Sequence, residues 1–377
     1  MAPKRVGIDL APAALTQTAP GTARLVREQA RALFRLPVDW EWVPLVESVE
    51  NPLWGELEDR QPIIVPGRRV SLRATFKVGE AWRKTGCQLG FSTAYFVPLG
   101  RFPVVANFFD SNIFEHGSTW LTSGRWKSYM LLQCLSRYAL RRAKRLFVLS
   151  GYCRDFLARK FPHCVSRLVT VPCGLTHLPP APPNHLPEWA RNLEGKFCLY
   201  VGAFSDNKNQ AALLEAWAEL QAEHDDLPAL VLLGPCDAAY RQRRIAPRLS
   251  ALLRPQAAIL PGLVSDADLS WAFQNAAFYV QPSIAEGFGM PVLEAMGHDL
   301  PVACSDSTSL PEVGGDATVY FNPHDIQSIK ASIRALWRDD PLREECRRKG
   351  RARCALFTWE QNARSVANEI DALLKAS

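Results

Sequence analysis

The sequence has few of the features that mark membrane-spanning, metal-bound or disulfide-linked proteins. None of its apolar runs approaches the ~18–20 residues that a membrane-spanning helix needs. Its first residues, MAPKRVGIDLAPAAL, contain no sustained apolar region, so we expect no secretory signal. The ten cysteines are scattered from Cys87 to Cys354 without a C-x-x-C pair or a matching histidine spacing. We therefore expect reduced, mostly buried thiols in a cytoplasmic protein, and neither a zinc site nor a disulfide framework.

Length and proline content predict two domains. The chain has 377 residues, more than one hydrophobic core usually supports, and an ordinary globular composition with 47% apolar and 22% charged residues. Five prolines lie between Pro179 and Pro187, where they exclude a helix or a central strand and favour a semi-rigid spacer. We expect a first domain over residues 1–178, a linker over 179–196 and a second domain from residue 197 to 356.

Charge is unevenly distributed along the chain. Residues 1–180 carry 25 lysines and arginines against 13 acidic residues, whereas the remainder carries 19 against 25. A basic first half favours an anionic acceptor or peripheral contact with an anionic membrane, on its cytoplasmic face. No helix-turn-helix, zinc finger or aromatic RNA-binding motif accompanies this charge, so nucleic acid is not an expected partner.

The stretch QPSIAEGFGMPVLEAMG, residues 281–297, has the pattern of a ligand site. The apolar run before it predicts a buried strand, its two glycines allow close backbone approach, and Pro291 suits the first turn of a helix. A helix that begins after such a turn directs amide groups and a positive dipole end at an anion. The carboxylates of Glu286 and Glu294 bracket the turn and suit the hydroxyl groups of a sugar. The alternative is an ordinary strand–turn–helix with two solvated glutamates.

The segment EGFGMPVLE, with its Glu286-x7-Glu294 spacing, resembles the signature of glycosyltransferase family 4, the retaining nucleotide-sugar transferases of the GT-B fold. The resemblance covers most of the chain and is specific from Phe197 to about Pro323. It implies an α/β protein with two Rossmann-like domains, whose parallel sheets face each other across a cleft. A C-terminal helix, residues 357–377, would return to the N-terminal, acceptor-binding domain, and the second domain would bind the donor.

The resemblance also implies roles for residues of the second domain. Glu294 would bind the ribose hydroxyls, Glu286 would contact the donor sugar, and Lys208 would neutralise the diphosphate after the strand 197–201 and Gly202. Relatives often carry an arginine either just after the glycine or just before the lysine, and these two places hold Ala203 and Asn207. The remaining donor contacts would come largely from backbone groups, namely Gly287, Phe288, Gly289 and Met290 at the sugar, and Leu263 and Val264 at the nucleotide base. Ser265 is expected to cap the next helix, with Asp268 at its third position.

In the first domain the resemblance places three residues on the acceptor side. Gly21 would lie in a glycine-containing loop before a helix over residues 22–36. Phe109 and Asp110 would end a strand over residues 103–110, where relatives often have His-Asp. Residues 37–75 are rich in Trp, Pro and Glu and predict short strands and loops.

The function implied is a retaining hexosyltransferase, with mannose favoured, acting from a nucleotide-diphosphate sugar onto a glycan or lipid-linked hydroxyl in surface polysaccharide or lipopolysaccharide biosynthesis. Glu286 and Lys208 would be the catalytic residues, with Glu286 as a covalent nucleophile the less favoured alternative. No Asp-x-Asp occurs in the signature region, so neither a metal nor another cofactor is expected. Two other functions remain: an inactive nucleotide-sugar-binding protein, which the missing arginine and Phe109 favour, and a nucleotide-sugar epimerase that uses no acceptor.

Overall fold

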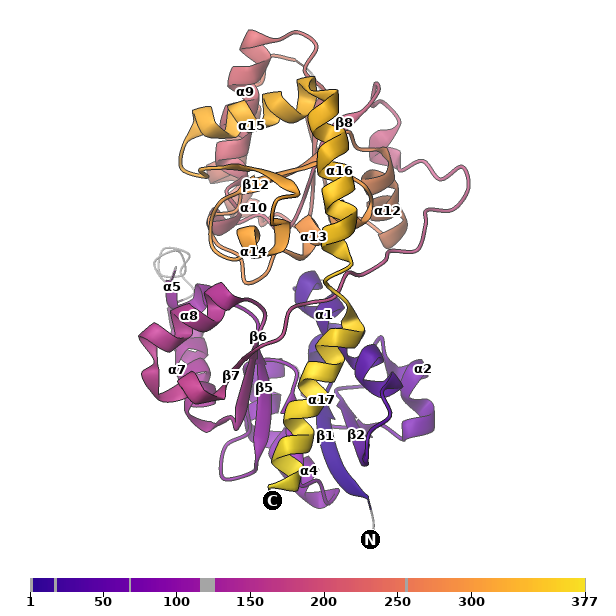
Figure 1. Ribbon diagram of the computed structural model, residues 1–377, viewed down its shortest axis with the longest axis vertical. Helices are drawn as coiled ribbons and strands as arrows, with labels where there is room; N and C mark the ends of the chain where they lie inside the picture. Colours follow the sequence, from indigo (N-terminus) through magenta and orange to yellow (C-terminus); the bar gives the residue numbers. More distant parts are fainter. Residues whose placement is uncertain (1–2, 17–18, 68, 116–125, 255–256, 377) are drawn as a thin grey trace. The chain divides into compact units, whose positions relative to one another are not determined.

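The computed structural model describes residues 3–16, 19–67, 69–115, 126–254 and 257–376. By its contacts the chain divides into two units (Figure 1). The first unit contains Met1–Gly174 and Phe357–Ser377, and the second contains Leu175–Leu356. Each unit is built on one parallel β-sheet, as the sequence predicted for a pair of α/β domains.

The first sheet has seven strands within the described residues, in the order β3-β2-β1-β4-β5-β6-β7. This is the doubly wound order, in which strands are added first on one side of β1 and then on the other. The strands are β1 (Lys4–Asp9), β2 (Trp40–Val46), β3 (Ile63–Ile64), β4 (Leu89–Ser92), β5 (Val104–Phe108), β6 (Arg145–Val148) and β7 (Leu168–Thr170).

Helices pack on this sheet through their apolar sides. On one face a single core joins side chains of β2, β5 and β6 to Trp82, Leu140 and Leu157 from three different helices. Figure 1 shows α1 and α17 lying side by side in the same unit, and the two helices are in contact. The helices are α1 (Pro20–Arg35), α2 (Trp54–Leu57), α3 (Val70–Arg73), α4 (Gly79–Lys84), α5 (Asn112–Glu115), α7 (Trp126–Arg142), α8 (Gly151–Lys160) and α17 (Trp359–Lys375).

A series of buried hydrogen bonds connects α17 to the rest of the first unit. The Asn107 amide donates to Gln29 Oε1 at 2.7 Å, and the Gln29 amide donates to Asn362 Oδ1 at 2.9 Å. Asn362 in turn donates to the carbonyl of Pro172 at 2.7 Å. Because Asn107, Gln29 and Asn362 are each at most 2% exposed, losing one partner would leave buried amide groups without hydrogen bonds. These hydrogen bonds make α17 part of the first unit's interior.

The second sheet has six strands among the described residues, in the order β10-β9-β8-β11-β12-β13. It repeats the doubly wound order of the first sheet, with β8 as its starting strand. The strands are β8 (Phe197–Val201), β9 (Ala229–Leu233), β10 (Ala258–Gly262), β11 (Phe278–Gln281), β12 (Val302–Ser305) and β13 (Thr318–Phe321).

One core of the second unit joins its strands to α9 and α15, through residues such as Trp217 and Ile333. The helix after β10 has the expected cap, because Ser265 Oγ accepts a hydrogen bond from the Asp268 amide at 3.1 Å. The helices are α9 (Gln210–Glu223), α10 (Ala238–Tyr240), α11 (Ala246–Leu249), α12 (Asp266–Asn275), α13 (Met290–Gly297), α14 (Leu310–Gly314), α15 (Ile326–Arg338) and α16 (Asp340–Cys354).

The proline-rich segment expected to be a linker makes specific contacts with the second unit. His185 Nε2 lies 2.7 Å from Asp268 Oδ1, and the Trp189 ring lies edge-on to those of Trp271 and Phe197. These contacts hold the segment against the start of β8 and against α12.

None of the helices in the described part of the chain is long and apolar enough to cross a membrane.

Candidate donor site in the second unit

The reversal of strand order in the second sheet brings two loops together. β8 and β11 are hydrogen-bonded neighbours. The chain nevertheless continues from β8 to β9 toward one edge of the sheet and from β11 to β12 toward the other edge. Such a switch point leaves a crevice at the carboxyl ends of the two strands, where doubly wound proteins bind ligands. Lys208 lies in a short 3₁₀ turn, Asp206–Lys208, of the loop after β8, and Glu286 lies in the loop after β11.

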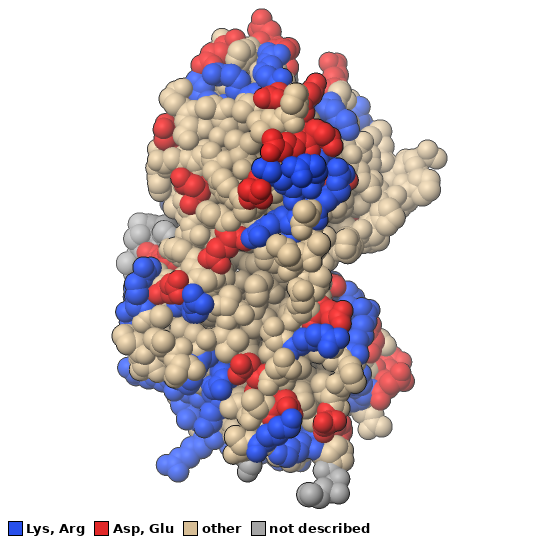
Figure 2. Space-filling view, in the orientation of Figure 1, with Lys and Arg blue, Asp and Glu red and all other residues tan. Residues whose placement is uncertain are grey.

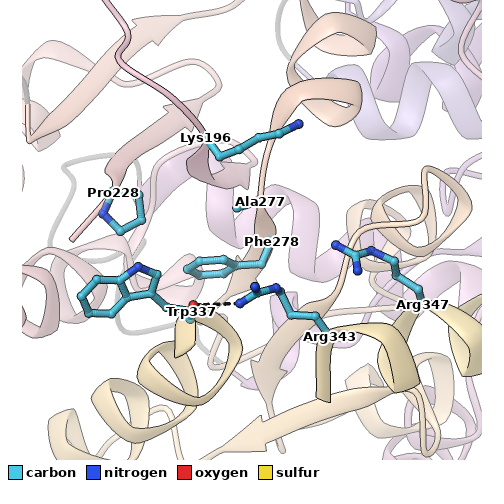
Figure 3. A pocket seen from close by; sticks show the side chains of 7 residues that line it. All are labelled: Lys196, Pro228, Ala277, Phe278, Trp337, Arg343 and Arg347. Carbon is cyan, nitrogen blue, oxygen red and sulfur yellow. Dashed lines mark hydrogen bonds between the residues drawn. The ribbon is translucent and has the colours of Figure 1, made fainter. Parts of the chain in front are cut away.

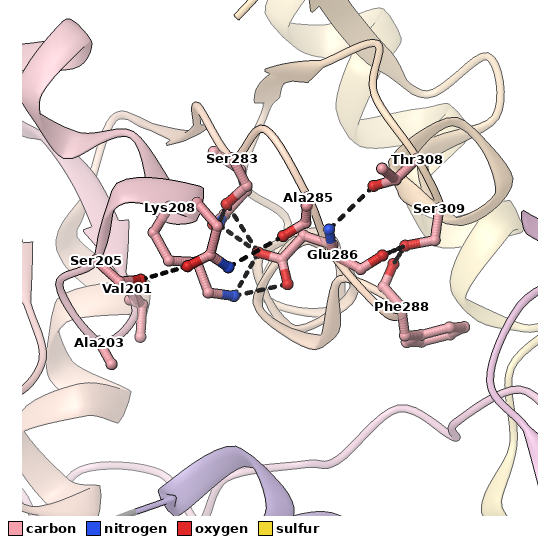
Figure 4. A network of polar contacts seen from close by, with 12 residues as sticks. Val201, Ala203, Ser205, Lys208, Ser283, Ala285, Glu286, Phe288, Thr308 and Ser309 are labelled. Carbon is pink, nitrogen blue, oxygen red and sulfur yellow. Dashed lines mark hydrogen bonds and ion pairs between the residues drawn. The ribbon is translucent and has the colours of Figure 1, made fainter. Parts of the chain in front are cut away.

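Lys208 and Glu286, which are 78 positions apart in the sequence, form an ion pair at this switch point (Figure 4). Lys208 Nζ lies 2.6 Å from each carboxylate oxygen of Glu286. The Glu286 side chain is 9% exposed and that of Lys208 is 24% exposed, so solvent reaches the ammonium side of the pair more readily. Water therefore screens this pair less than it screens a surface ion pair.

Neighbouring polar groups fix the orientation of the Glu286 carboxylate. Its Oε1 accepts hydrogen bonds from Ser283 Oγ at 2.8 Å and from Gln281 Nε2 at 3.0 Å. The Tyr279 hydroxyl donates to Gln281 Oε1, which directs the amide nitrogen of Gln281 toward Glu286. Burial, with the Glu286 charge nearby, raises the pKa of Tyr279 well above its ordinary value, so its hydroxyl stays protonated.

The backbone of the Glu286 turn is also held from two sides. On one side, the Asn207 carbonyl accepts from the Ile284 amide at 2.8 Å, joining the loops that follow β8 and β11. On the other, the Glu286 amide donates to Thr308 Oγ1 at 3.0 Å, and Ser309 Oγ lies 2.9 Å from the carbonyls of Glu286 and Phe288. Thr308 itself has a φ of 53°, an unfavourable backbone conformation for a β-branched residue.

Gly289 makes the sharp entry into α13. It precedes the helix with a φ of 110°, and a Cβ built there would lie 2.7 Å from Leu310 Cδ2. Pro291 then occupies the first turn, where a missing N–H is tolerated. The turn thus points the positive end of α13 toward the crevice beside Lys208 and Glu286.

We expect Gly289→Ala to destabilise the second unit by about 1–3 kcal/mol, because alanine is strained at this φ and its methyl group meets Leu310. The shift in the urea unfolding midpoint measures the effect. Gly21→Ala is the matched control, since Gly21 lies in α1 with no atom within 4 Å of its built Cβ. An unchanged midpoint for Gly289→Ala would contradict the account of this turn.

The other expected donor residues lie around the same edge of the sheet or in the helix that follows. Gly202 directly follows β8, and Leu263 and Val264 directly follow β10, so all three stand at carboxyl ends of parallel strands. Phe288 is buried and Met290 begins α13, while Gly287 lies between Glu286 and Phe288. Glu294 lies inside α13 and is 4% exposed, eight residues after Glu286.

The three expected acceptor-side residues lie in the first unit. Gly21 does not lie in a loop as predicted, because Pro20 starts α1 one residue earlier and places Gly21 in its first turn. Phe109 and Asp110 follow β5, which ends at Phe108. Phe109 is 7% exposed, with its ring edge-on to Tyr95. Asp110 accepts from the Asn112 amide at 3.0 Å, and its charge adds to burial in raising the pKa of Cys153 to about 12.

Sequence reasoning missed the residues that hold Glu286 in place. Gln281 and Ser283 belong to the signature segment but have no distinctive spacing, and Thr308 and Ser309 come from the loop after β12. The sequence also did not indicate which basic residue could replace the arginine that relatives carry near Lys208. In the structure Arg244 Nε lies 3.1 Å from Asp206 Oδ1 and brings a second basic side chain to the loop of Lys208.

Part of the chain is similar to known glycosyl transferases. Residues 183–353 match the family model described as "Glycosyl transferases group 1". O-antigen chain mannosyltransferase B of Escherichia coli is 32% identical over 231 residues, which are 60% of this chain and 60% of that protein. The serotype-specific mannosyltransferase WbdA of Escherichia coli is 31% identical over 186 residues, 49% of this chain and 23% of that protein. The chain thus spans less than two thirds of the length of these relatives.

Solved structures resemble the whole chain. A sucrose-phosphate synthase from Thermosynechococcus elongatus superposes with a TM-score of 0.75 at 18% identity, covering 99% of this chain and 100% of that one. WaaG, described as a glycosyltransferase involved in lipopolysaccharide biosynthesis, gives a TM-score of 0.71 at 15% identity, with 96% and 98% covered. Anabaena HepE in complex with UDP and glucose also gives 0.71 at 15% identity, with both chains fully covered. The chain has the GT-B fold, and its residues 183–353 match the glycosyl transferases group 1 family.

Proposed function

We propose that this protein is a retaining glycosyltransferase that moves a hexose, with mannose favoured, from a nucleotide-diphosphate sugar to a hydroxyl of a glycan or lipid-linked acceptor. Its place would be the biosynthesis of a surface polysaccharide such as a lipopolysaccharide O-chain. The names of the two mannosyltransferase relatives support the sugar and the pathway class. The UDP and glucose bound to HepE support a nucleotide-sugar donor.

The Lys208–Glu286 pair at the switch point is the observation that carries the proposal. A diphosphate at the start of α13 would compete with Glu286 for the Lys208 ammonium, because phosphate oxygens carry more charge than one carboxylate. Glu286 Oε1 would stay held by Gln281 and Ser283. Among the described residues Oε2 accepts a hydrogen bond from Lys208 alone, so it would become available to a sugar hydroxyl. One movement of Lys208 would thus couple diphosphate binding to sugar binding.

In the reaction we propose, the bond from the anomeric carbon to the diphosphate oxygen breaks, and a bond to the acceptor oxygen forms on the same face of the sugar. The leaving diphosphate takes the proton of the acceptor hydroxyl. Lys208 and the amide groups at the start of α13 stabilise the charge that develops on the diphosphate. Glu286 orients the sugar through its hydroxyls, and Glu294 would bind the ribose.

The proposal is tested by a thermal-shift screen of the purified chain against GDP-, UDP-, TDP- and ADP-sugars. A donor at about a hundred times its Kd should stabilise the protein by ~2.7 kcal/mol, enough to raise its melting temperature visibly. A responding donor is then incubated with and without glycan acceptors, and the anomeric configuration of the product is read by NMR. Binding without transfer would instead indicate a nucleotide-sugar-binding protein, and conversion of the donor alone would indicate an epimerase.

We propose that transfer needs no metal ion, because Lys208 and the α13 amides supply the positive potential at the diphosphate. Excess EDTA should leave the transfer rate within about twofold of the untreated rate. The positive potential of Lys208 and the α13 amides does not change when metal ions are chelated. Restoration of a lost rate by added Mg²⁺ or Mn²⁺ would contradict this part of the proposal.

Peripheral binding to an anionic membrane is also proposed, through the exposed side of α7. Met130 and Leu131 are 50% and 39% exposed, and Arg137 and Arg141 lie farther along the same helix face. Apolar and basic side chains together favour the surface of an anionic bilayer. The chain should sediment with vesicles containing phosphatidylglycerol, and Met130→Ser with Arg141→Glu should weaken binding about tenfold. Arg348→Glu, in the second unit, is the charge-matched control, and equal loss in both variants would refute the assignment to α7.

A further inference from the structure

A second concave site lies in the second unit, at the edge of the sheet opposite the Lys208–Glu286 pair (Figure 3). Lys196, Pro228 and Ala277 line it, and each immediately precedes a strand, namely β8, β9 and β11. Lys208 and Glu286 follow the far ends of β8 and β11. Because β8 has five residues, the two sites are separated by about 16 Å of strand or more. The site has a volume of about 360 Å³, at the lower end of the range for small-molecule pockets.

Three cationic side chains line this site. Lys196 comes from the chain before β8, and Arg343 and Arg347 lie one turn apart on α16. Within the described part of the chain, Lys196 has no hydrogen bond or ion pair. Among the described residues, Arg347 Nη1 pairs only with Glu344, at 3.2 Å, and the Glu344 side chain is 66% exposed. These two cations are therefore weakly compensated, although acidic and basic side chains are otherwise interspersed over α16 (Figure 2).

Arg343 has a structural role as well. It donates to the carbonyls of Leu336 and Trp337 at 2.7 and 2.8 Å, at the end of α15, and pairs with Asp340. These bonds hold its guanidinium in place beside the site, as Figure 3 shows. A cation fixed in this way loses little conformational entropy when it contacts an anion.

Flat apolar groups form the rest of the lining. The rings of Trp337 and Phe278 lie beside the Arg343 guanidinium in Figure 3, next to Pro228. Arg338 packs over the Trp337 ring, with its Cζ atom 3.6 Å from the ring centroid, and pairs with Asp226. These contacts fix Trp337 from outside the site. The lining thus combines positive charge with an aromatic surface.

We propose that this site binds a phosphomonoester that carries a small ring, and that it is separate from the donor site. Two guanidinium groups and one ammonium suit the charge of a phosphate better than that of a neutral sugar. Trp337 supplies the surface against which a ring can pack. The inference does not depend on the proposed transferase activity, because none of the lining residues contacts Lys208 or Glu286.

The test is isothermal titration calorimetry of the full chain with phenyl phosphate and with inorganic phosphate at low ionic strength. Both probes should bind, and phenyl phosphate should bind more tightly because of its ring. Lys196→Ala with Arg347→Ala should weaken the binding of phenyl phosphate at least about tenfold, through loss of two charge-assisted contacts. Both side chains lie at the surface, and Arg343, which caps α15, is left intact so that folding is not disturbed.

Two control variants locate the bound phosphate. Arg348→Ala removes an exposed positive charge from α16 without touching the site, and should leave the affinity within about twofold. Lys208→Ala, at the donor site, should leave phenyl phosphate binding unchanged. Equal affinity of the Lys196→Ala, Arg347→Ala variant and the original chain would overturn the proposal, as would loss of binding in Lys208→Ala. Failure of all nucleotide-sugars to bind would refute the transferase without affecting this result.

Discussion

Glu286→Gln lowers the rate of sugar transfer by on the order of a hundredfold or more, while the protein stays folded; this is the largest effect that we expect on catalysis. Glutamine has nearly the volume of glutamate, so the packing around Gln281 and Ser283 is kept. It lacks the negative charge, and one of its terminal atoms is a donor rather than an acceptor. A sugar hydroxyl facing that donor loses its acceptor in the crevice, and loss of one such preorganised contact typically costs 10²–10³ in rate.

Single-turnover transfer from the donor found in the thermal-shift screen measures this effect, and circular dichroism with the melting temperature reports folding. Glu194→Gln serves as the matched control, since Glu194 is exposed and lies in the same unit before β8. A Glu286→Gln enzyme that turns over within threefold of the original chain would remove Glu286 from the reaction. A rate that falls together with the melting temperature would point to a structural role instead.

Lys208→Ala should weaken the binding of the nucleotide diphosphate by roughly 10- to 100-fold. Each charge-assisted hydrogen bond to the diphosphate contributes about 1.5–3 kcal/mol. The variant also leaves the buried Glu286 carboxylate without its cation, and the negative carboxylate then repels the diphosphate. The lost positive charge and the added repulsion both weaken donor binding. We therefore expect the donor affinity to fall more than the free energy of unfolding.

Calorimetric titration with the free nucleoside diphosphate gives this affinity without a contribution from the sugar. Arg243→Ala removes one positive charge from an exposed position of the same unit and should change the Kd by less than about twofold. Unchanged affinity in Lys208→Ala would show that another basic group holds the diphosphate. Arg244, which pairs with Asp206 in the same loop, would then be the next residue to replace.

Local sequence signals were sufficient for the framework of the second unit. The run from Phe197 to Val201 was predicted as a strand and is β8, and the glycine turn before Met290 leads into α13 as predicted. These signals are short: an apolar run, a glycine that takes a positive φ, and a proline at the start of a helix. Such features depend on neighbouring residues only, so the sequence contains them in full.

The surroundings of Glu286 could not be predicted in the same way. Lys208 is 78 positions away and Thr308 is 22 positions away, and both reach Glu286 only because β8, β11 and β12 are neighbours in one sheet. No periodicity in the sequence records which loops meet at a switch point. The resemblance to a family gave Lys208 and Glu286 each a role, but it did not state that they would contact one another.

Residues 37–75, which are rich in Trp, Pro and Glu, contain a strand that includes a proline. β2, Trp40–Val46, is next to β1 in the sheet, yet it contains Pro44, which cannot donate a hydrogen bond. The structure tolerates Pro44 because β3 pairs only with Leu45 and Val46, which leaves the outer side of β2 at Pro44 without a neighbouring strand. The prediction of short strands in this range thus holds for β2 and β3, whereas the short helices α2 and α3 were not predicted.

The position of α17 has a consequence for synthesis on the ribosome. The second unit interrupts the first between Gly174 and Phe357, so the whole of Leu175–Leu356 is synthesised before α17. At ~5–20 residues per second, this delay lasts about 10–40 s. Throughout that time Gln29 lacks its Asn362 partner, and the apolar side of α1 that faces α17 stays open to water. The nascent first unit therefore exposes this apolar side until its last helix is synthesised, while the second unit can fold from a continuous piece of chain.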